Sequence, residues 1–521
     1  MASGQQQGQL SWGDALFLYL EREGTPLNIA SVSVFDGPIS LDACRRFIES
    51  KLPSIPRYYQ KVVAPPFNTG LPNWEYDYEF DICNHVREVV LKRGTDAEFK
   101  ALAGKLFGKL MDREHPLWDF TLVHGLKGDR TGVIARVHHC LADGVAGVGL
   151  MNVIFDQSPD PPSLPKRRVR FQPPRRHDPI TSLADGLVGS WSNFVERTLT
   201  AQADLLTIVQ KLLAGNESQP GGEVARYFPE LLAPTERLRF NVTCQGPQKY
   251  VWAEMPLAEI NKIREHGGAT INDVVLAVVT VTIRRYAELH GDRVRGKSLR
   301  MMVPVSLRNG HGGLGNRISL LPLTVPLDLR SPRKLISAVH RRMEFLKRAP
   351  VAEFFSLAGN LIGATATALQ AIAGPIAGTL PLTVFNLVCT NVPGPQVPLY
   401  LLGRKMLCWY PYVPVGGEIS VNCAVLTYNG TAYFGVSGDA QAAPDLGQLE
   451  KLLRLSIEEF RSTIGAVKGR AAKPKRGHKA VPVAPRSTKR AVLIPVTPVD
   501  SRATAEAGPQ APTVGTAAAA D

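Results

Sequence analysis

The residues best suited to chemistry are two adjacent histidines followed by an aspartate and a glycine, in the run His138-His139-Cys140-Leu141-Ala142-Asp143-Gly144. A neutral imidazole with one nitrogen held by a hydrogen bond can use the other to deprotonate a hydroxyl that attacks a carbonyl. Residues 132–137 have the β-branched composition of a strand, and residues 145–155 have the apolar spacing of a helix. We therefore predict a strand-to-helix turn that presents a general base to a cavity.

Strand alternation separates the roles of the two histidines. In an extended strand, His139 shares a face with Val137 and Ala135, whereas His138 shares the opposite face with Cys140. We expect His139 to be the base and His138 to support it. Asp143 lies four positions beyond His139, too constrained for a triad, and is expected to fix the turn before Gly144 by a salt bridge or a helix cap.

Two other interpretations of the same residues stay open at this point. The histidines could be polar residues that end a strand, with Asp143 as an ordinary N-cap. Cys140 could also be a nucleophile paired with a histidine, although adjacent strand residues point in opposite directions.

Length and composition bound the class of protein. A chain of 521 residues predicts two domains, and a hydrophobic content of 44% indicates a globular protein. Seven scattered cysteines without a CxxC pair indicate reduced thiols and predict no metal site. The first twenty residues lack a basic n-region, so we expect a cytoplasmic protein without a cleaved signal peptide.

The net charge of +14 is unevenly distributed. Residues 468–521 carry ten Lys or Arg and three Asp or Glu, and a second basic cluster lies among prolines at 166–176. These clusters suit an anionic membrane surface, or they are solvated segments. No zinc-finger, RNP or recognition-helix pattern accompanies them, so we expect no nucleic acid partner. The sequence leaves the oligomeric state open.

Composition shifts divide the chain into four parts. We predict a first domain over 1–160, a Pro/Arg-rich and helical linker over 161–232, a second domain over 233–465 and a disordered basic tail over 466–521. The strongest elements of the second domain are a helix at 271–289 and strands at 299–305, 382–390, 419–428 and 432–437. Residues 354–373 carry no charge, but glycines, threonines and Asn360 favour a buried or interfacial helix over a membrane span.

The HHxxxDG pattern at 138–144 is the signature of the CoA-dependent acyltransferase superfamily, and the chain resembles the bacterial wax ester synthase/diacylglycerol acyltransferase family within it. The resemblance runs in order from about Leu10 to Gly465. It includes the opening 10–17, residues 79–87, Pro116-Leu117-Trp118, residues 268–275 with Asn272-Asp273, residues 303–308 with Ser306-Leu307-Arg308, and 390–395 with Asn391. The chain departs from the family pattern at Cys140, often alanine, and at Asp119, commonly glutamate.

This resemblance implies an α/β fold with two chloramphenicol-acetyltransferase-like domains of mixed sheet and flanking helices. It also implies transfer of a fatty acyl group from acyl-CoA, a co-substrate, to diacylglycerol or a long-chain alcohol at a membrane or lipid-droplet surface, with no cofactor. His139, His138, Asp143 and Gly144 would form the catalytic turn. Further residues are expected to bind substrate: Pro116, Leu117, Trp118, Asn272, Asp273, Ser306, Arg308 and Asn391.

Several of these assignments have structural alternatives. Thr270 and Asp273 form a capping-box pattern, Leu117 and Trp118 suit a core as well as a tunnel wall, and Arg308 could pair with Asp143. Two other functions stay open: a lipid-binding protein without catalysis, and an amide-forming condensation enzyme, although no carrier or adenylation domain accompanies the motif.

Overall fold

The computed structural model describes residues 8–65, 68, 70–160, 235–265, 268–306, 318–348 and 384–470. The predicted linker 161–232, the charge-free segment 354–373 and nearly all of the tail 466–521 lie outside these residues, as do Leu307 and Arg308. Within the described part of the chain, no helix is both long enough and apolar enough to cross a membrane.

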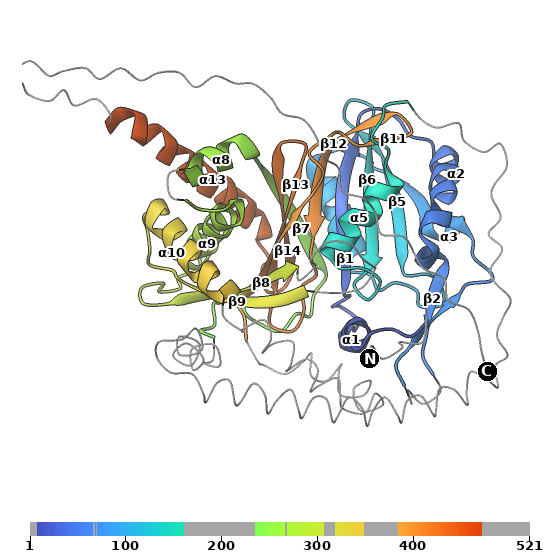
Figure 1. The fold of residues 1–521 in the computed structure, drawn as a ribbon, viewed down its shortest axis with the longest axis horizontal. Coiled ribbons are helices and arrows are strands. Elements are labelled where there is room, and N and C mark those ends of the chain that lie inside the picture. The colour runs from blue at the N-terminus through green and yellow to red at the C-terminus, as the bar shows by residue number, and fades with distance from the viewer. Residues whose placement is uncertain are drawn as a thin grey trace, which may run out of the picture. The chain divides into compact units, whose positions relative to one another are not determined.

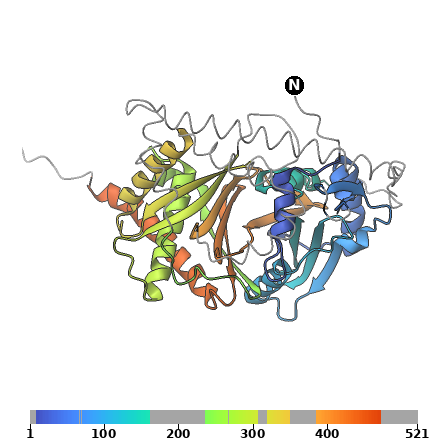
Figure 2. The ribbon, with the colours of Figure 1, turned by 90° about the horizontal axis from the view of Figure 1, so that it is seen from below.

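Two six-stranded mixed sheets form the framework, and helices pack around them (Figures 1 and 2). The first sheet has the order β11 (Tyr400–Leu401), β12 (Arg404–Tyr412), β1 (Asn28–Phe35), β6 (Arg130–His138), β5 (Trp118–Leu126) and β4 (Val86–Val90). The second has the order β7 (Gln248–Pro256), β14 (Thr431–Asp439), β13 (Val421–Tyr428), β10 (Leu387–Pro393), β8 (Ser298–Ser306) and β9 (Ile318–Pro326). β2 (Gln60–Val63) and β3 (Asn73–Tyr76) form a small antiparallel pair.

The helices divide between the two sheets (Figure 1). The first half of the chain supplies α1 (Trp12–Leu20), α2 (Leu41–Lys51), α3 (Ile82–His85), α4 (Asp96–Phe107) and α5 (Gly144–Ile154), with short 3₁₀ turns at Leu52–Ser54 and Pro56–Tyr59. The second half supplies α8 (Leu257–Glu265), α9 (Ile271–Leu289), α10 (Pro332–Arg348) and α13 (Leu446–Arg470). The mixed α/β architecture agrees with the predicted fold class.

The predicted elements and the observed ones agree closely where a local pattern defines them. Helix α9 has the predicted bounds, and its capping box is formed because Thr270 and Asp273 exchange side-chain and backbone hydrogen bonds. Strand β10 begins at Leu387, five residues later than predicted. Strands β6 and β13 are buried along nearly their whole length, which explains their continuous apolar composition.

Two strands of the first sheet, β11 and β12, come from the second half of the chain. β12 pairs with β1, with Val32 opposite Tyr410, so the first sheet is completed by residues some 370 positions away from β1. The domain division predicted from the sequence, 1–160 and 233–465, does not anticipate that β12 pairs with β1. Hydrogen bonds link β12 to the second sheet, as where Tyr250 of β7 donates to the carbonyl of Pro411 at 2.7 Å.

We expect Gly435→Ala to destabilise the protein, because Gly435 of β14 lies where the two sheets meet. A Cβ at this position would overlap the backbone carbonyl oxygen of Pro411. Overpacking of this kind costs about 1–3 kcal/mol, to be measured as the free energy of unfolding in urea. Gly447→Ala is the matched control, since a Cβ there meets nothing within 4 Å. Equal stability of the two variants would contradict this close approach.

Candidate active site

The histidine turn lies between β6 and α5, as the sequence predicts. β6 ends at His138, so His139 is in the turn rather than in the strand, and strict alternation does not extend to it. Two backbone hydrogen bonds fix the turn, from His138 N to the carbonyl of Leu117 and from His139 N to that of Leu27, each 2.9 Å long. The two imidazoles diverge.

His139 faces a large apolar cavity. Its ring stacks on Phe17 of α1, with 3.9 Å between ring centroids and 9° between the planes. Burial lowers the pKa of His139 to about 4, so its imidazole is neutral at physiological pH. A neutral, partly buried imidazole on a cavity wall is in the protonation state that a general base requires.

His138 is fully buried and points away from the cavity. Its Nδ1 accepts a hydrogen bond of 3.1 Å from the backbone N–H of Cys140, so its proton is on Nε2. That Nε2 lies 3.2 Å from Oε1 of Glu21, a residue that the sequence reasoning did not single out. A buried carboxylate therefore fixes the ring of the supporting histidine.

Glu21 is held by several donors. The backbone N–H of Leu27 donates to Oε1 at 3.0 Å, and the guanidinium of Arg113 donates to Oε2 at 3.0 Å. Burial alone would raise the pKa of Glu21, but the contacts with His138, Leu27 and Arg113 outweigh it and lower the pKa to about 2. Glu21 directly follows the apolar run of α1, but no spacing in the sequence links residue 21 to residue 138.

Asp143 is the N-cap of α5. It is buried, and its carboxylate accepts a hydrogen bond of 2.7 Å from the N–H of Ala146. Gly144, the first residue of the helix, lines the cavity, and a Cβ there would come within 3.1 Å of Val392. The proposed partner of Asp143, Arg308, lies outside the described residues.

Cys140 is a poor nucleophile in this setting. It is buried, and burial raises the pKa of its thiol well above the ordinary value, so it is not a thiolate. Its side chain does not belong to the cavity lining. This geometry argues against a Cys-His pair.

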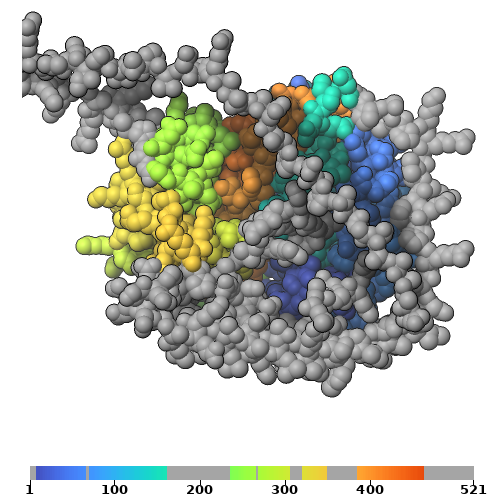
Figure 3. Space-filling model, in the orientation of Figure 1, coloured from blue at the N-terminus to red at the C-terminus, as the bar shows by residue number. Residues whose placement is uncertain are grey.

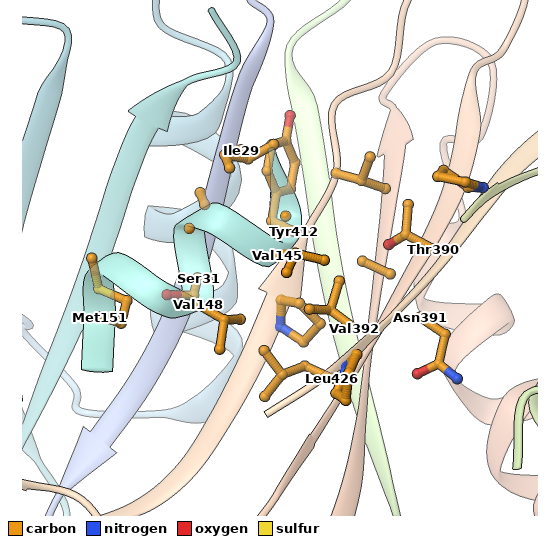
Figure 4. Close-up of a pocket in the computed structure, with 18 of the residues that line it drawn as sticks. Ile29, Ser31, Val145, Val148, Met151, Thr390, Asn391, Val392, Tyr412 and Leu426 are labelled. Carbon is orange, nitrogen blue, oxygen red and sulfur yellow. The ribbon is translucent and has the colours of Figure 1, made fainter. Parts of the chain in front are cut away.

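The cavity has a volume of about 530 Å³ and lies between β1, β6 and α5 on one side and β8, β10 and β13 on the other. Met151, Val148 and Ile29 line one side, and Thr390 and Asn391 approach from β10 on the other (Figure 4). The segments meeting there are therefore drawn from both halves of the chain. A cavity of this composition can hold an apolar chain beside a base.

The structure separates the predicted substrate-binding residues into two groups. Asn272 and Asn391 line the cavity, and Asn391 Nδ2 donates to Asn272 Oδ1 at 3.2 Å. Pro116, Leu117, Trp118 and Asp273 are buried in the protein and are not part of the described lining. Ser306 ends β8, next to the lining residues Pro304 and Val305.

The second group has structural contacts instead. Trp118 stacks on Tyr58 and His85 and donates from Nε1 to the carbonyl of Tyr58 at 2.8 Å. Leu117 supplies the carbonyl that anchors His138. Asp273 caps α9 and lies 2.8 Å from Nδ1 of His340. Next to the motif, Asp119 pairs with Arg136 of β6, with Nε 2.9 Å from Oδ1.

The low pKa of His139 predicts an unusual pH profile. A base with a pKa of about 4 stays neutral above that pH, so the acid limb of kcat/KM should lie near pH 4 rather than near 6.5. Initial rates between about pH 3 and 8 measure this limb, with circular dichroism at each pH to exclude unfolding. An acid limb centred at pH 6–7 in folded protein would contradict the buried environment of this imidazole.

Two family models match the chain. The wax ester synthase/diacylglycerol acyltransferase catalytic domain matches residues 10–275, and the WS/DGAT C-terminal domain matches residues 314–461. Among curated relatives, "Probable diacyglycerol O-acyltransferase tgs1" of Mycobacterium tuberculosis is 29% identical over 82% of this chain and 89% of its own length. "O-acyltransferase WSD" of Acinetobacter baylyi is 27% identical over 87% of this chain and 96% of its own.

Solved structures share the fold. The wax ester synthase/diacylglycerol acyltransferase of Marinobacter aquaeolei VT8 superposes with a TM-score of 0.61 at 23% identity, covering 88% of this chain and 99% of that one. The first condensation domain of the calcium-dependent antibiotic synthetase superposes with a TM-score of 0.54 at 15% identity, covering 88% and 97%. The model matches span most of the chain and include the histidine turn, so the chain belongs to the wax ester synthase/diacylglycerol acyltransferase family of O-acyltransferases.

Proposed function

We propose that this enzyme transfers a fatty acyl group from acyl-CoA to the hydroxyl of diacylglycerol or of a long-chain alcohol, with His139 as the general base. The observation that carries the proposal is the neutral imidazole of His139 on the wall of a large apolar cavity. An apolar cavity suits fatty chains, and a neutral base suits a hydroxyl nucleophile.

The proposed reaction is a direct attack. His139 takes the proton of the acceptor hydroxyl as its oxygen forms a bond to the thioester carbon. The carbon–sulfur bond then breaks, the acyl group leaves as an ester, and the CoA thiolate recovers the proton from the imidazolium. No covalent acyl-enzyme and no cofactor takes part, and Cys140 keeps its proton throughout.

The supporting residues have positioning roles in this proposal. Glu21 contacts the ring of His138. The backbone hydrogen bond of His138 and the carboxylate of Asp143, which caps α5, fix the turn that contains His139. Phe17 limits the orientation of the His139 ring by stacking on it. The base is thereby oriented before substrate arrives, which avoids a reorganisation cost during reaction.

A product assay tests the proposed function. Purified protein is incubated with labelled palmitoyl-CoA and either hexadecanol or dioleoylglycerol, and neutral lipids are separated by chromatography. We expect a labelled wax ester, triacylglycerol or both, together with free CoA. Labelled CoA ester that stays unconverted with both acceptors would refute the proposal and favour a lipid-binding protein without catalysis.

Acyl chain selectivity should be broad. Each buried methylene contributes about 0.8 kcal/mol, so an apolar cavity binds long chains strongly but distinguishes neighbouring lengths poorly. Competition between acyl-CoAs of 12 to 18 carbons measures the ratio of kcat/KM values. A single sharp optimum would contradict this expectation.

We also propose that the enzyme works at a membrane or lipid-droplet surface, because both acceptors are insoluble in water. The basic clusters at 166–176 and 468–521 supply a charge that anionic lipid attracts. Flotation with phosphatidylglycerol vesicles, compared with phosphatidylcholine vesicles, measures this attraction, and equal recovery with both would contradict it.

A further inference from the structure

The lining of the cavity beside His139 includes polar side chains whose chemistry matches the CoA part of the donor. Asn272 at the start of α9, Thr390 and Asn391 on β10 and Lys347 on α10 all belong to its lining. Resting on the proposed function, we propose that Lys347 binds a phosphate of the CoA moiety and that the Asn272–Asn391 pair lies along its pantetheine arm.

The asparagine pair offers the groups that an amide-containing arm requires. Asn391 Nδ2 donates to Asn272 Oδ1 at 3.2 Å, which fixes the two side-chain amides relative to each other. Asn391 keeps its carbonyl oxygen as an acceptor, and Asn272 keeps its amide N–H groups as donors. The pantetheine arm carries two amides, each with one N–H and one C=O, so it can use both kinds of group.

Lys347 supplies a positive charge to this lining. Helix α10 carries six basic residues and one acidic residue, Glu344, which pairs with Arg348 at 3.1 Å. Lys347 is exposed, and among the described residues no acidic side chain lies within ion-pair distance of it. Part of the surface formed by residues 318–348 is seen in yellow in Figure 3. The side chain of Lys347, near the end of α10, is exposed and so is accessible to a charged group that stays in water.

On the opposite side of the cavity, the described lining residues include no unpaired cationic side chain and no side-chain amide. Ile29, Val148 and Met151 present apolar side chains there, opposite Thr390 and Asn391 in Figure 4. Arg136 also contributes to the lining, but its guanidinium is paired with Asp119. The donor is therefore oriented with its fatty chain toward α5 and its nucleotide toward the end of α10.

Two donors that differ in their phosphates test this orientation. Decanoyl-CoA and S-decanoylpantetheine carry the same acyl thioester and the same arm with two amides, but the second has no phosphate. Initial rates with hexadecanol in neutral detergent micelles give KM and kcat for the wild type, Lys347→Gln and Lys347→Arg. Lys334→Gln is the matched control, since Lys334 is exposed on the same helix but does not line the cavity.

We expect Lys347→Gln to raise KM for decanoyl-CoA about 3- to 10-fold at low ionic strength with little change in kcat, as for loss of one partly exposed ion pair. Lys347→Arg should restore most of the affinity, Lys334→Gln should resemble the wild type, and none of the variants should alter KM for the phosphate-free donor. Added salt should reduce the difference between Lys347→Gln and the wild type.

Three results would overturn the assignment while leaving the proposed function intact. The first is an unchanged KM for decanoyl-CoA in Lys347→Gln, and the second is an equal rise for both donors. The third is an effect seen only after phosphatidylglycerol vesicles are added, which would assign the phosphate to a lipid head group. If the wild type forms no ester from either donor, the proposed function itself fails.

Discussion

Replacing His139 by alanine should lower kcat by about 10²- to 10⁴-fold, the contribution of a positioned general base. The variant should keep a folded cavity, because the ring lies on the cavity wall, where it stacks on Phe17. The measurement is the initial rate of labelled ester formation from palmitoyl-CoA, with the melting temperature followed in parallel. The loss should appear in kcat rather than in KM, since the imidazole accepts the hydroxyl proton in the transition state and does not contribute to substrate binding.

Cys140→Ala is the matched control for this substitution. The buried, protonated thiol takes no part in the proposed reaction, so this variant should retain most of the wild-type rate. A rate in His139→Ala close to the wild type would refute the general-base assignment. Loss of activity in Cys140→Ala with a normal melting temperature would instead favour a cysteine nucleophile.

Glu21→Gln should cost about 3 kcal/mol of folding stability and slow the reaction up to about 100-fold. The substitution replaces a negatively charged carboxylate by a neutral amide. The Glu21 side chain is 2% exposed, and it contacts His138, Arg113 and the Leu27 N–H. Arg113 is 48% exposed and can be solvated, so most of the stability loss comes from the weakened buried contacts of the carboxylate with His138 and with the Leu27 N–H. The rate should fall because a small displacement of the catalytic turn misplaces His139.

The pH dependence of stability gives this prediction a second measurement. The folded-state pKa of Glu21, about 2, lies below its ordinary value of 4.5. The stability that this carboxylate contributes is therefore fully present above pH 4.5 and is lost as the pH falls toward 2. Urea unfolding across this range should show a shallower pH dependence for Glu21→Gln than for the wild type.

Glu23→Gln provides the matched control, because Glu23 is exposed two residues further along the same loop. This variant should match the wild type in stability and rate. If Glu21→Gln were as stable and as active as Glu23→Gln, the buried network around His138 would have no positioning role.

The sequence predicted the local features of this protein well. The apolar runs of β6 and α5, the turn between them and the capping box of α9 depend on residues within about ten positions of one another, and each formed close to its predicted bounds. The divergence of two adjacent imidazoles was also predictable, although His139 reaches the cavity from the turn rather than from the strand.

Contacts between distant residues could not be predicted in the same way. Nothing in the spacing of Glu21 and His138 indicates that they meet, because α1 and β6 are separated by more than a hundred residues and are joined only by packing. The same holds for β12, which enters the first sheet from the second half of the chain. Burial also sets the protonation states of these side chains, because desolvation lowers the pKa of His139 and raises that of the Cys140 thiol.

The substrate-binding residues illustrate both cases. Asn272, Asn391 and Trp118 were singled out by the same kind of motif, but the structure places the two asparagines on the cavity wall and stacks Trp118 in the core. A motif records which residues occur together in a family, whereas their side-chain directions depend on how sheets and helices pack. The sequence by itself determined the family, the candidate base and the turn that carries it. The tertiary structure decided which side chains share the cavity, because only folding brings residues of β10, α9 and α10 to the cavity that β6 also lines.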